Sequence, residues 1–281
     1  MSPAADPYHC QAQAHLVAKP FIPTTRDLPA SVARRIVDAL LNLVFPESCF
    51  VCDAPVSRHQ DCGVCDMCWG KALRLRIQEP WCASCGLPFQ NLGTGETHLC
   101  SDCILRPPPF SGARSFGYYA AELSRMVLYL KFRRRQNLVG LLAPLLTSTF
   151  FDSWQRSEFD VIVPVPLHPR RRRERGYNQA ALLGRALARH VALPICENAL
   201  LRVRYTVPQV GLTDPERLRN VHGAFRCRKQ ATVANQRVLL VDDVMTTGAT
   251  LASAAEALLR GGALRVSAIT VARAVPGLQD L

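Results

Sequence analysis

The pattern of apolar and polar positions divides the chain into three parts. Residues 1–30 are rich in Ala and Pro without a clean period, which predicts a flexible tail. Residues 31–45 repeat apolar side chains at helical spacing, between Ser31 as N-cap and Pro46 as the stop, which predicts a helix. Residues 49–103 have poor periodicity and many turn residues, so their order must come from another source, and bound metal can supply it.

From residue 113 onward, apolar strands alternate with helices. Strands are predicted at 113–119, 161–166, 237–243 and 265–272, and helices at 122–132, 137–151, 180–191 and 250–262, the second helix interrupted or bent near Pro144 and the last capped by Gly261. Strands that are apolar throughout indicate a parallel sheet with helices on both faces. The sequence therefore predicts an α/β domain over 109–281, preceded by a small Cys-rich domain with its lead helix over 31–108.

Composition and charge narrow the class of protein. With 48% hydrophobic and 20% charged residues, the chain is globular and not mostly disordered. No apolar run reaches the roughly 18 residues of a membrane span, and the N-terminus lacks the apolar stretch of a signal peptide. We therefore expect a cytoplasmic protein without membrane insertion. Lys and Arg total 34 against 22 Asp and Glu, a net charge of +12, which favours phosphate-bearing partners; solubility alone is the alternative.

Five Cys-x-x-Cys spacings lie within residues 49–103, where chance placement gives roughly half of one. Each such turn presents two thiolates to a tetrahedral zinc ion. The simplest division gives two closed, structural zinc sites: Cys49, Cys52, Cys65 and Cys68, then Cys82, Cys85, Cys100 and Cys103. Interleaved pairing, disulfides, iron–sulfur ligation and a redox role stay open as alternatives. Cys62 is surplus, either as a replacement ligand or as a free thiol.

Residues 238–251 combine an apolar strand, two acids, a loop of small residues and the start of a helix. The acids are Asp242 and Asp243, and the loop is Thr246, Thr247, Gly248, Ala249 and Thr250. A helix N-terminus attracts anions, and a glycine lets the backbone approach a phosphate closely. Adjacent carboxylates at the carboxyl end of a strand suit ribose hydroxyls or hydrated magnesium. Neither a Walker loop nor a dinucleotide fingerprint fits; an acidic strand end before a capped helix is the plain alternative.

Two further segments carry candidate contacts. Residues 163–179 contain Arg170, Arg171 and Arg175, whose guanidinium groups suit pyrophosphate, although a solvated basic loop and a nucleic-acid contact with Tyr177 stay open. Residues 206–225 form a long connection typical of a lid, or else a surface hairpin. Its candidate contact residues are Gln209, Arg217 and Asn220.

The acid pair and threonine loop resemble the phosphoribosyl-pyrophosphate (PRPP) loop of type I phosphoribosyltransferases. The resemblance implies that Asp242 and Asp243 contact the ribose 2′ and 3′ hydroxyls and that the loop holds the 5′-phosphate. The segment 163–179 is similar to the pyrophosphate loop of that family. Together with the cysteine ribbon, the Leu130–Phe132 step and residues 206–225, these motifs resemble the ComF family, including GntX-like members. Lys131 fits a family position, although a lysine that lies along its helix towards solvent is the ordinary expectation.

The resemblance implies a role in DNA uptake, or in the use of imported DNA, with two zinc ions and magnesium-bound PRPP or a related sugar phosphate. Whether the chain catalyses phosphoribosyl transfer stays open, because the sequence shows neither a base-recognition pocket nor a general base. The alternative is a binding module without catalysis. Such a module keeps the PRPP loop as a sensor or a relic, while ribbons and arginines bind single-stranded DNA and a DNA-translocating helicase.

Overall fold

A computed structural model describes residues 48–56, 62–89, 98–205, 223–228 and 230–275. These residues form two compact units, one ending at Gly70 and the other beginning at Lys71. Each unit is described by itself. The predicted tail 1–30 and helix 31–45 lie outside the described residues, and the predicted domain boundary after residue 108 stays a prediction.

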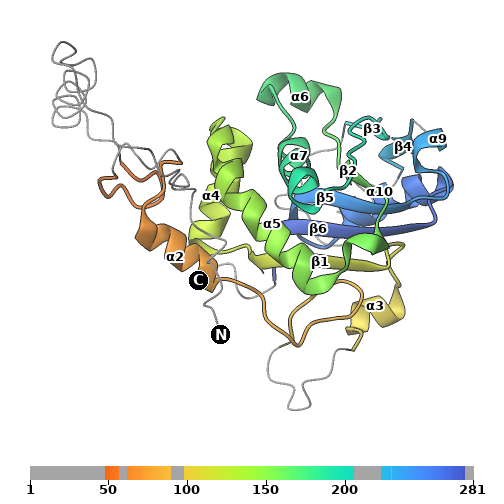
Figure 1. Cartoon of the computed structure of the whole chain (residues 1–281), viewed down its shortest axis with the longest axis horizontal. Coiled ribbons are helices and arrows are strands. Elements are labelled where there is room, and N and C mark those ends of the chain that lie inside the picture. The colour runs from red at the N-terminus through yellow and green to blue at the C-terminus, as the bar shows by residue number, and fades with distance from the viewer. Residues whose placement is uncertain (1–47, 57–61, 90–97, 206–222, 229, 276–281) are drawn as a thin grey trace, which may run out of the picture. The chain divides into compact units, whose positions relative to one another are not determined.

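The second unit is built on a four-stranded parallel sheet (Figure 1). Its strands are β1 Gly112–Tyr118, β2 Val161–Pro164, β5 Arg237–Met245 and β6 Arg265–Arg273, in the spatial order β1-β6-β5-β2. All three neighbouring pairs run parallel, with Leu240 opposite Ala268 in the central pair. The central strands are buried nearly throughout. The predicted parallel sheet is therefore confirmed.

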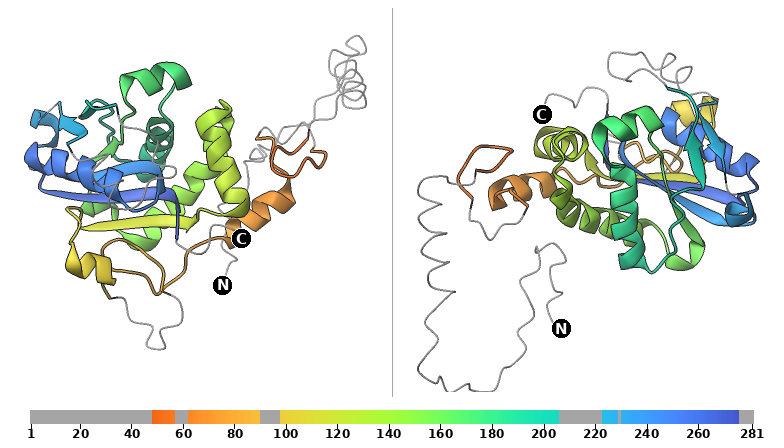
Figure 2. Two further views of the ribbon diagram at one scale, coloured as in Figure 1. Left: turned by 180° about the vertical axis from the view of Figure 1, so that it is seen from behind. Right: turned by 90° about the horizontal axis from the view of Figure 1, so that it is seen from above.

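Helices cover both faces of this sheet (Figures 1 and 2). The main ones are α4 Ala121–Phe132, α5 Val139–Ser153, α7 Gln179–Val191 and α10 Ala249–Arg260, with short helices η1 Gln136–Leu138, η2 Arg156–Glu158 and α9 Gln230–Val233 between them. Gly184 of α7 packs on the Ile162 side chain of β2. Leu251 of α10 shares a core with Val163, the neighbour of Ile162 along the strand. Because side chains alternate along a strand, α7 and α10 lie on opposite faces.

Two predictions about helices are corrected. Of the two outcomes predicted at Pro144, an interruption or a bend, the interruption is wrong, because α5 runs unbroken from Val139 to Ser153. Proline removes one backbone donor near the start of the helix, while Leu142, Leu145 and Leu146 are fully buried and hold the helix in place. The Cys-rich segment is also more regular than its periodicity indicated. It contains α2 Asp66–Arg74 and α3 Ser101–Leu105, both of which begin within a Cys-x-x-Cys turn.

A small two-stranded sheet joins β3 Leu200–Arg202 to β4 Phe225–Cys227 in antiparallel pairing. These strands flank the predicted lid. Its candidate residues Gln209, Arg217 and Asn220 lie outside the described residues. Within the described ranges, no helix is long and apolar enough to cross a membrane.

Candidate functional site

Asp242 and Asp243 lie near the carboxyl end of β5, on the wall of a cavity of about 570 Å³. Both residues are buried, at 9% and 3% exposure. The Asp243 N–H donates to Asp242 Oδ1 at 2.9 Å, and Lys131 Nζ lies 3.1 Å from Asp243 Oδ1. Asp243 Oδ2 is buried and has no hydrogen-bond partner among the described residues. A buried oxygen without a partner is ready to accept a bond from a ligand hydroxyl or a hydrated cation.

The electrostatics of this pair follow from its burial. The pKa of Asp242 is raised to about 8, first by burial and then by the charge of Asp243, while Lys131 acts in the opposite direction. Burial and the neighbouring carboxylate both disfavour a second charge here, so the raised pKa favours the protonated form of Asp242 near neutral pH. A carboxyl group with a strongly shifted pKa in a cleft is a mark of a functional site.

The loop after β5 leads into the N-terminus of α10. Thr246, Gly248 and Thr250 line the cavity, whereas Thr247 Oγ1 accepts a hydrogen bond from the Ala249 N–H at 3.4 Å. Gly248 has a φ of +80°, and a Cβ at this position would lie 2.8 Å from the Met245 side chain. Only glycine satisfies both conditions without strain. The free N–H groups of the helix start and its dipole favour an anion in this loop.

The arginine-rich segment forms a helix, α6 Pro169–Arg175, and not the predicted loop. His168 caps its start by accepting a bond from the Arg170 N–H, and Gly176 ends it in the left-handed conformation with φ +85°. Arg171 and Arg175 line the cavity. Arg170 is not among the lining residues.

Arg175 is held in place on two sides. Its Nη1 donates to Gln179 Oε1 at 2.5 Å, and its guanidinium group lies 5.1 Å from the centre of the Phe132 ring. The Tyr177 hydroxyl donates to the backbone carbonyl of Leu130. Tyr177 is thus packed against α4, which argues against its use as a stacking surface for bases.

The cavity also contains two cationic residues outside the predicted set of site residues. Lys131 points inward to the acid pair, contrary to the ordinary expectation of a solvated lysine. Arg202, from β3, lines the same cavity. Burial and the charge of Arg171 lower the pKa of Arg202, whereas Asp242 raises it. Cations from three elements, α4, α6 and β3, thus line the cavity that holds the acids. Lys131 could have been found from the sequence, because it lies in the Leu130–Phe132 motif. No pattern in the sequence points to Arg202.

An exposed tyrosine lies beside the arginine helix. Tyr205 is 46% exposed, and the guanidinium groups of Arg170 and Arg171 lie 5.0 Å and 5.7 Å from the centre of its ring. The His168 ring meets the same tyrosine edge-on at 5.2 Å. Arginines around an exposed aromatic ring are typical of surfaces that bind single-stranded nucleic acid.

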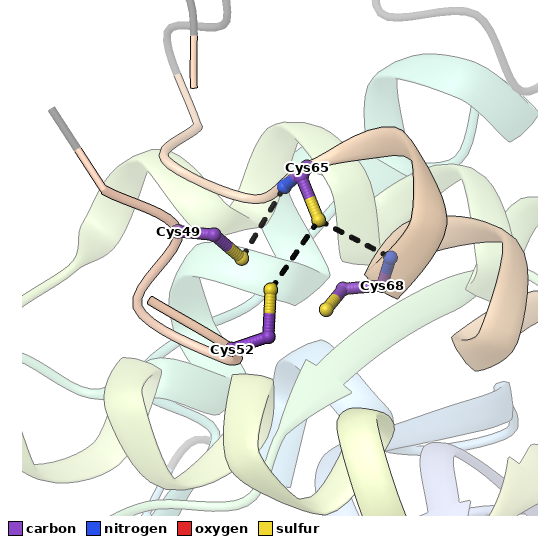
Figure 3. Close-up of side chains that lie close together, drawn as sticks. All are labelled: Cys49, Cys52, Cys65 and Cys68. Carbon is purple, nitrogen blue, oxygen red and sulfur yellow. Dashed lines mark hydrogen bonds between the residues drawn. The ribbon is translucent and has the colours of Figure 1, made fainter. Parts of the chain in front are cut away.

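The first cysteine cluster belongs to the first unit. Cys49 and Cys52 lie on one turn, and Cys65 and Cys68 lie at the start of α2, with all four sulfur atoms facing one point (Figure 3). The Cys65 N–H donates to Cys49 Sγ at 3.4 Å. Cys52 is exposed and Cys65 half-buried.

The second cluster consists of Cys82, Cys85, Cys100 and Cys103, and all four cysteines are buried. Burial acts to raise the pKa of Cys82, but backbone N–H donors of the cluster outweigh it and lower this pKa to about 6. One of these donors is the Cys100 N–H, at 3.3 Å. A thiol that loses its proton easily is suited to bind a metal ion.

Both groups fit structural zinc. Within each group all the ligand atoms lie within 4.8 Å of one another, and four thiolates close a tetrahedral site. The pairing follows the simplest division predicted from the sequence. Cys62 belongs to neither group in the part of the chain that the structure describes.

Comparison with known proteins agrees with this architecture. A family model described as a double zinc ribbon domain matches residues 40–104, and one for a phosphoribosyl transferase domain matches residues 178–277. A solved structure of a glutamine PRPP amidotransferase from B. subtilis covers 46% of this chain and 25% of its own, with 21% identity and a TM-score of 0.31. The two family models show that the chain joins a double zinc ribbon to a phosphoribosyltransferase domain.

Full-length relatives define the family. The DNA utilization protein YhgH of Salmonella typhi is 36% identical over 80% of this chain and 96% of its own length. Competence protein F of Haemophilus influenzae is 32% identical over 69% of this chain and 85% of its own. The chain belongs to the family of DNA utilization and competence proteins that includes these two.

Proposed function

We propose that this protein binds magnesium-bound PRPP in the β5–α10 cavity and acts in DNA uptake or in the use of imported DNA, in the cytoplasm. The observation that carries the proposal is one cavity that holds the buried acid pair, the threonine loop at a helix start, and cationic side chains. The family names of the relatives support the biological role. A related sugar phosphate fits the same chemistry.

The proposed binding mode assigns one task to each wall. Asp242 and Asp243 accept bonds from the ribose 2′ and 3′ hydroxyls, and the loop from Thr246 to Thr250 binds the 5′-phosphate. Arg171 and Arg175 face the pyrophosphate. Magnesium, when bound, neutralises negative charge on the pyrophosphate oxygens. The unsatisfied Asp243 Oδ2 supports this assignment, because a ribose hydroxyl supplies the missing donor.

If the protein catalyses transfer, a nucleophile forms a bond to C1 of the ribose while the bond from C1 to the pyrophosphate oxygen breaks. The electron pair of that bond leaves with pyrophosphate. Arg171 and Arg175 stabilise the charge that grows on the leaving group. Lys131, held by Asp243 at 3.1 Å, keeps the acid pair from repelling an anionic ligand.

The test is calorimetric titration of magnesium-PRPP into the wild type and an Asp242→Ala/Asp243→Ala variant, with pyrophosphate release assayed in the same samples. The control is Asp152→Ala/Glu256→Ala, which removes two acids outside the cavity. We expect binding in the wild type and control and its loss in the acid-pair variant. Release that rises with added candidate bases indicates a transferase, and binding without release indicates a sensor. No binding by the wild type contradicts the proposal.

A second candidate is binding of single-stranded DNA, with a DNA-translocating helicase as partner. The contact with DNA draws support from Tyr205 and its arginines. Base stacking on an aromatic ring contributes about 1–3 kcal/mol, so Tyr205→Ala is expected to weaken oligonucleotide binding about tenfold. Phe151→Ala is the control, because Phe151 is an exposed aromatic residue elsewhere. Affinity should also fall steeply with salt; a salt-independent affinity contradicts an electrostatic contact.

A further inference from the structure

Arg273, the last residue of β6, lies between the second cysteine cluster and the phosphate loop. It is 5% exposed although it carries a charge. Its Nη1 donates to the Cys85 carbonyl at 2.6 Å, and its Nη2 lies 3.5 Å from Cys85 Sγ. The same Nη1 lies 3.0 Å from Met245 Sδ. One guanidinium group thus contacts both a cluster ligand and the residue that precedes the loop.

Met245 carries this contact to the loop. It lies opposite Arg273 in the β5–β6 pairing, and its side chain fills the space beside Gly248. Met245, which pairs with Arg273, and Ala274, which follows Arg273 in the chain, both line the cavity. The Arg273 carbonyl also accepts a bond from the N–H of Tyr119, another cavity residue, at 2.7 Å. A displaced Arg273 would therefore disturb the cavity wall at several points.

Charge explains why a guanidinium group stands here. Four thiolates around a divalent ion leave a net charge of −2, and the four cysteines are at most 8% exposed. A buried charge of this size requires a buried counter-charge or hydrogen-bond donors. Arg273 supplies both to Cys85. Hydrogen bonds from outside the ligand set also orient metal ligands and adjust their affinity.

We propose that Arg273 is a positioning residue that couples the second zinc centre to the phosphate loop, so that zinc at this centre orders the loop for its ligand. The ligand part rests on the proposed function, whereas the ordering of the loop does not. Coupling free energies are reciprocal, so ligand binding in the cavity must also alter the metal centre.

The first test needs no ligand. Hydrogen–deuterium exchange at residues 246–250 is compared among zinc-loaded wild type, Arg273→Met and Arg273→Lys in the full chain. Arg265→Met is the matched control, because Arg265 is the first residue of β6 and lies at the opposite end of that strand from Arg273. We expect about tenfold faster loop exchange in Arg273→Met, an intermediate rate in Arg273→Lys and no change in the control. Loop exchange at the wild-type rate in both Arg273 variants overturns the proposal.

The second test reads the metal centre. Cobalt(II) replaces zinc in a chain with Cys49→Ser/Cys52→Ser, so that the thiolate-to-cobalt absorption bands report the second cluster. Magnesium-PRPP should shift these bands in that background and leave them unchanged once Arg273→Met is added. If Arg273→Met does not fold, Arg273→Lys takes its place and should show a smaller shift. Bands that shift equally with and without Arg273 contradict the proposal.

The two tests separate their failures. If the wild type does not bind magnesium-PRPP, the proposed function fails, and the exchange measurement still decides the role of Arg273. If the wild type binds, Arg273→Met is expected to weaken the affinity about tenfold at unchanged zinc content, within the range of typical couplings between sites. Unchanged affinity together with unchanged loop exchange shows that Arg273 only fills space.

Discussion

The two cysteine clusters have the same four ligands and similar spacing, yet their surroundings differ. In the first unit, the cluster places Cys52 in solvent and leaves Cys65 half-buried. In the second unit, all four cysteines are buried and belong to one core with α10 and the sheet. The comparison teaches that equal ligand sets serve different purposes. Among the described residues, the first cluster lies in a short segment with few buried apolar side chains besides cysteines, whereas the second is packed into the core of the sheet.

Backbone contacts explain this integration of the second cluster. The Ala113 N–H of β1 donates to the carbonyl of Ser84 at 2.7 Å, and Ser84 lies in the Cys82–Cys85 turn of the second cluster. Gly86 packs so closely that a Cβ there would lie 2.4 Å from the Ala113 carbonyl oxygen. The turn is thus attached to the sheet edge by its backbone, and Arg273 attaches it again by a side chain.

The largest expected effect is the loss of fold when cysteine ligands of one cluster or the other are replaced. Structural zinc contributes about 10–16 kcal/mol in small domains, which exceeds or matches the about 5–15 kcal/mol that holds a typical domain together. Cys82→Ser/Cys100→Ser is therefore expected to unfold the unit from Lys71 onward, whereas Cys49→Ser/Cys52→Ser disorders only the first. Limited proteolysis with zinc analysis measures this. A sheet that stays protease-resistant in Cys82→Ser/Cys100→Ser would show that the second cluster does not hold this unit together.

Two glycines, one beside each cluster, compare how tightly the two turns are packed. Gly86 and Gly63 both have positive φ, at +70° and +66°, but the nearest atom to a Cβ at Gly63 is a Phe50 side-chain carbon at 3.4 Å. Gly86→Ala meets a backbone oxygen and should cost about 3 kcal/mol, whereas Gly63→Ala should cost about 1 kcal/mol. Denaturant unfolding of each unit gives these values. Equal losses would mean that the second turn is no more tightly packed than the first.

The pH response is expected to depend on the cavity and not on the first cluster. Asp242 has a raised pKa of about 8, and its proton must leave before the carboxylate can accept ribose hydroxyls. Affinity for magnesium-PRPP should therefore rise with pH, by up to about tenfold per unit below pH 8, and level off above it. Calorimetry from pH 6 to 9 tests this. Asp242→Asn removes the dependence, and Cys49→Ser/Cys52→Ser keeps it; a flat wild-type profile contradicts the assignment.

The same carboxyl group also affects the stability of the second unit. Because the folded pKa of Asp242 exceeds the unfolded value near 4, the folded state binds its proton more tightly and loses stability as pH rises through this range. Asp242→Asn, which cannot ionise, should stabilise the second unit by about 1 kcal/mol at pH 5 and by up to about 4 kcal/mol at pH 7, measured by denaturant unfolding. At pH 4 the gain should vanish. A destabilised variant at pH 7 would show that the charged form is the one the fold favours.

The sequence predicted the sheet, the position of the acid pair near the end of β5 and the division of the cysteines well, because each depends on local periodicity or spacing. Leu240 and Ala268 lie in strands that are apolar throughout, and this pattern alone indicates a buried parallel sheet. Pro144 was misjudged because burial of its neighbours outweighs the lost backbone bond. Arg202 and Arg273 could not be found, because their roles arise from strands brought together across long stretches of chain.

The most direct test of the account is titration of magnesium-PRPP into three full-length, zinc-loaded proteins: wild type, Cys49→Ser/Cys52→Ser and Arg273→Met. The account predicts that loss of the first cluster changes the affinity by less than about twofold, while Arg273→Met weakens it about tenfold at unchanged zinc content in the second cluster. Equal weakening in both variants, or wild-type affinity in Arg273→Met, would contradict the claim that the second cluster alone supports the cavity.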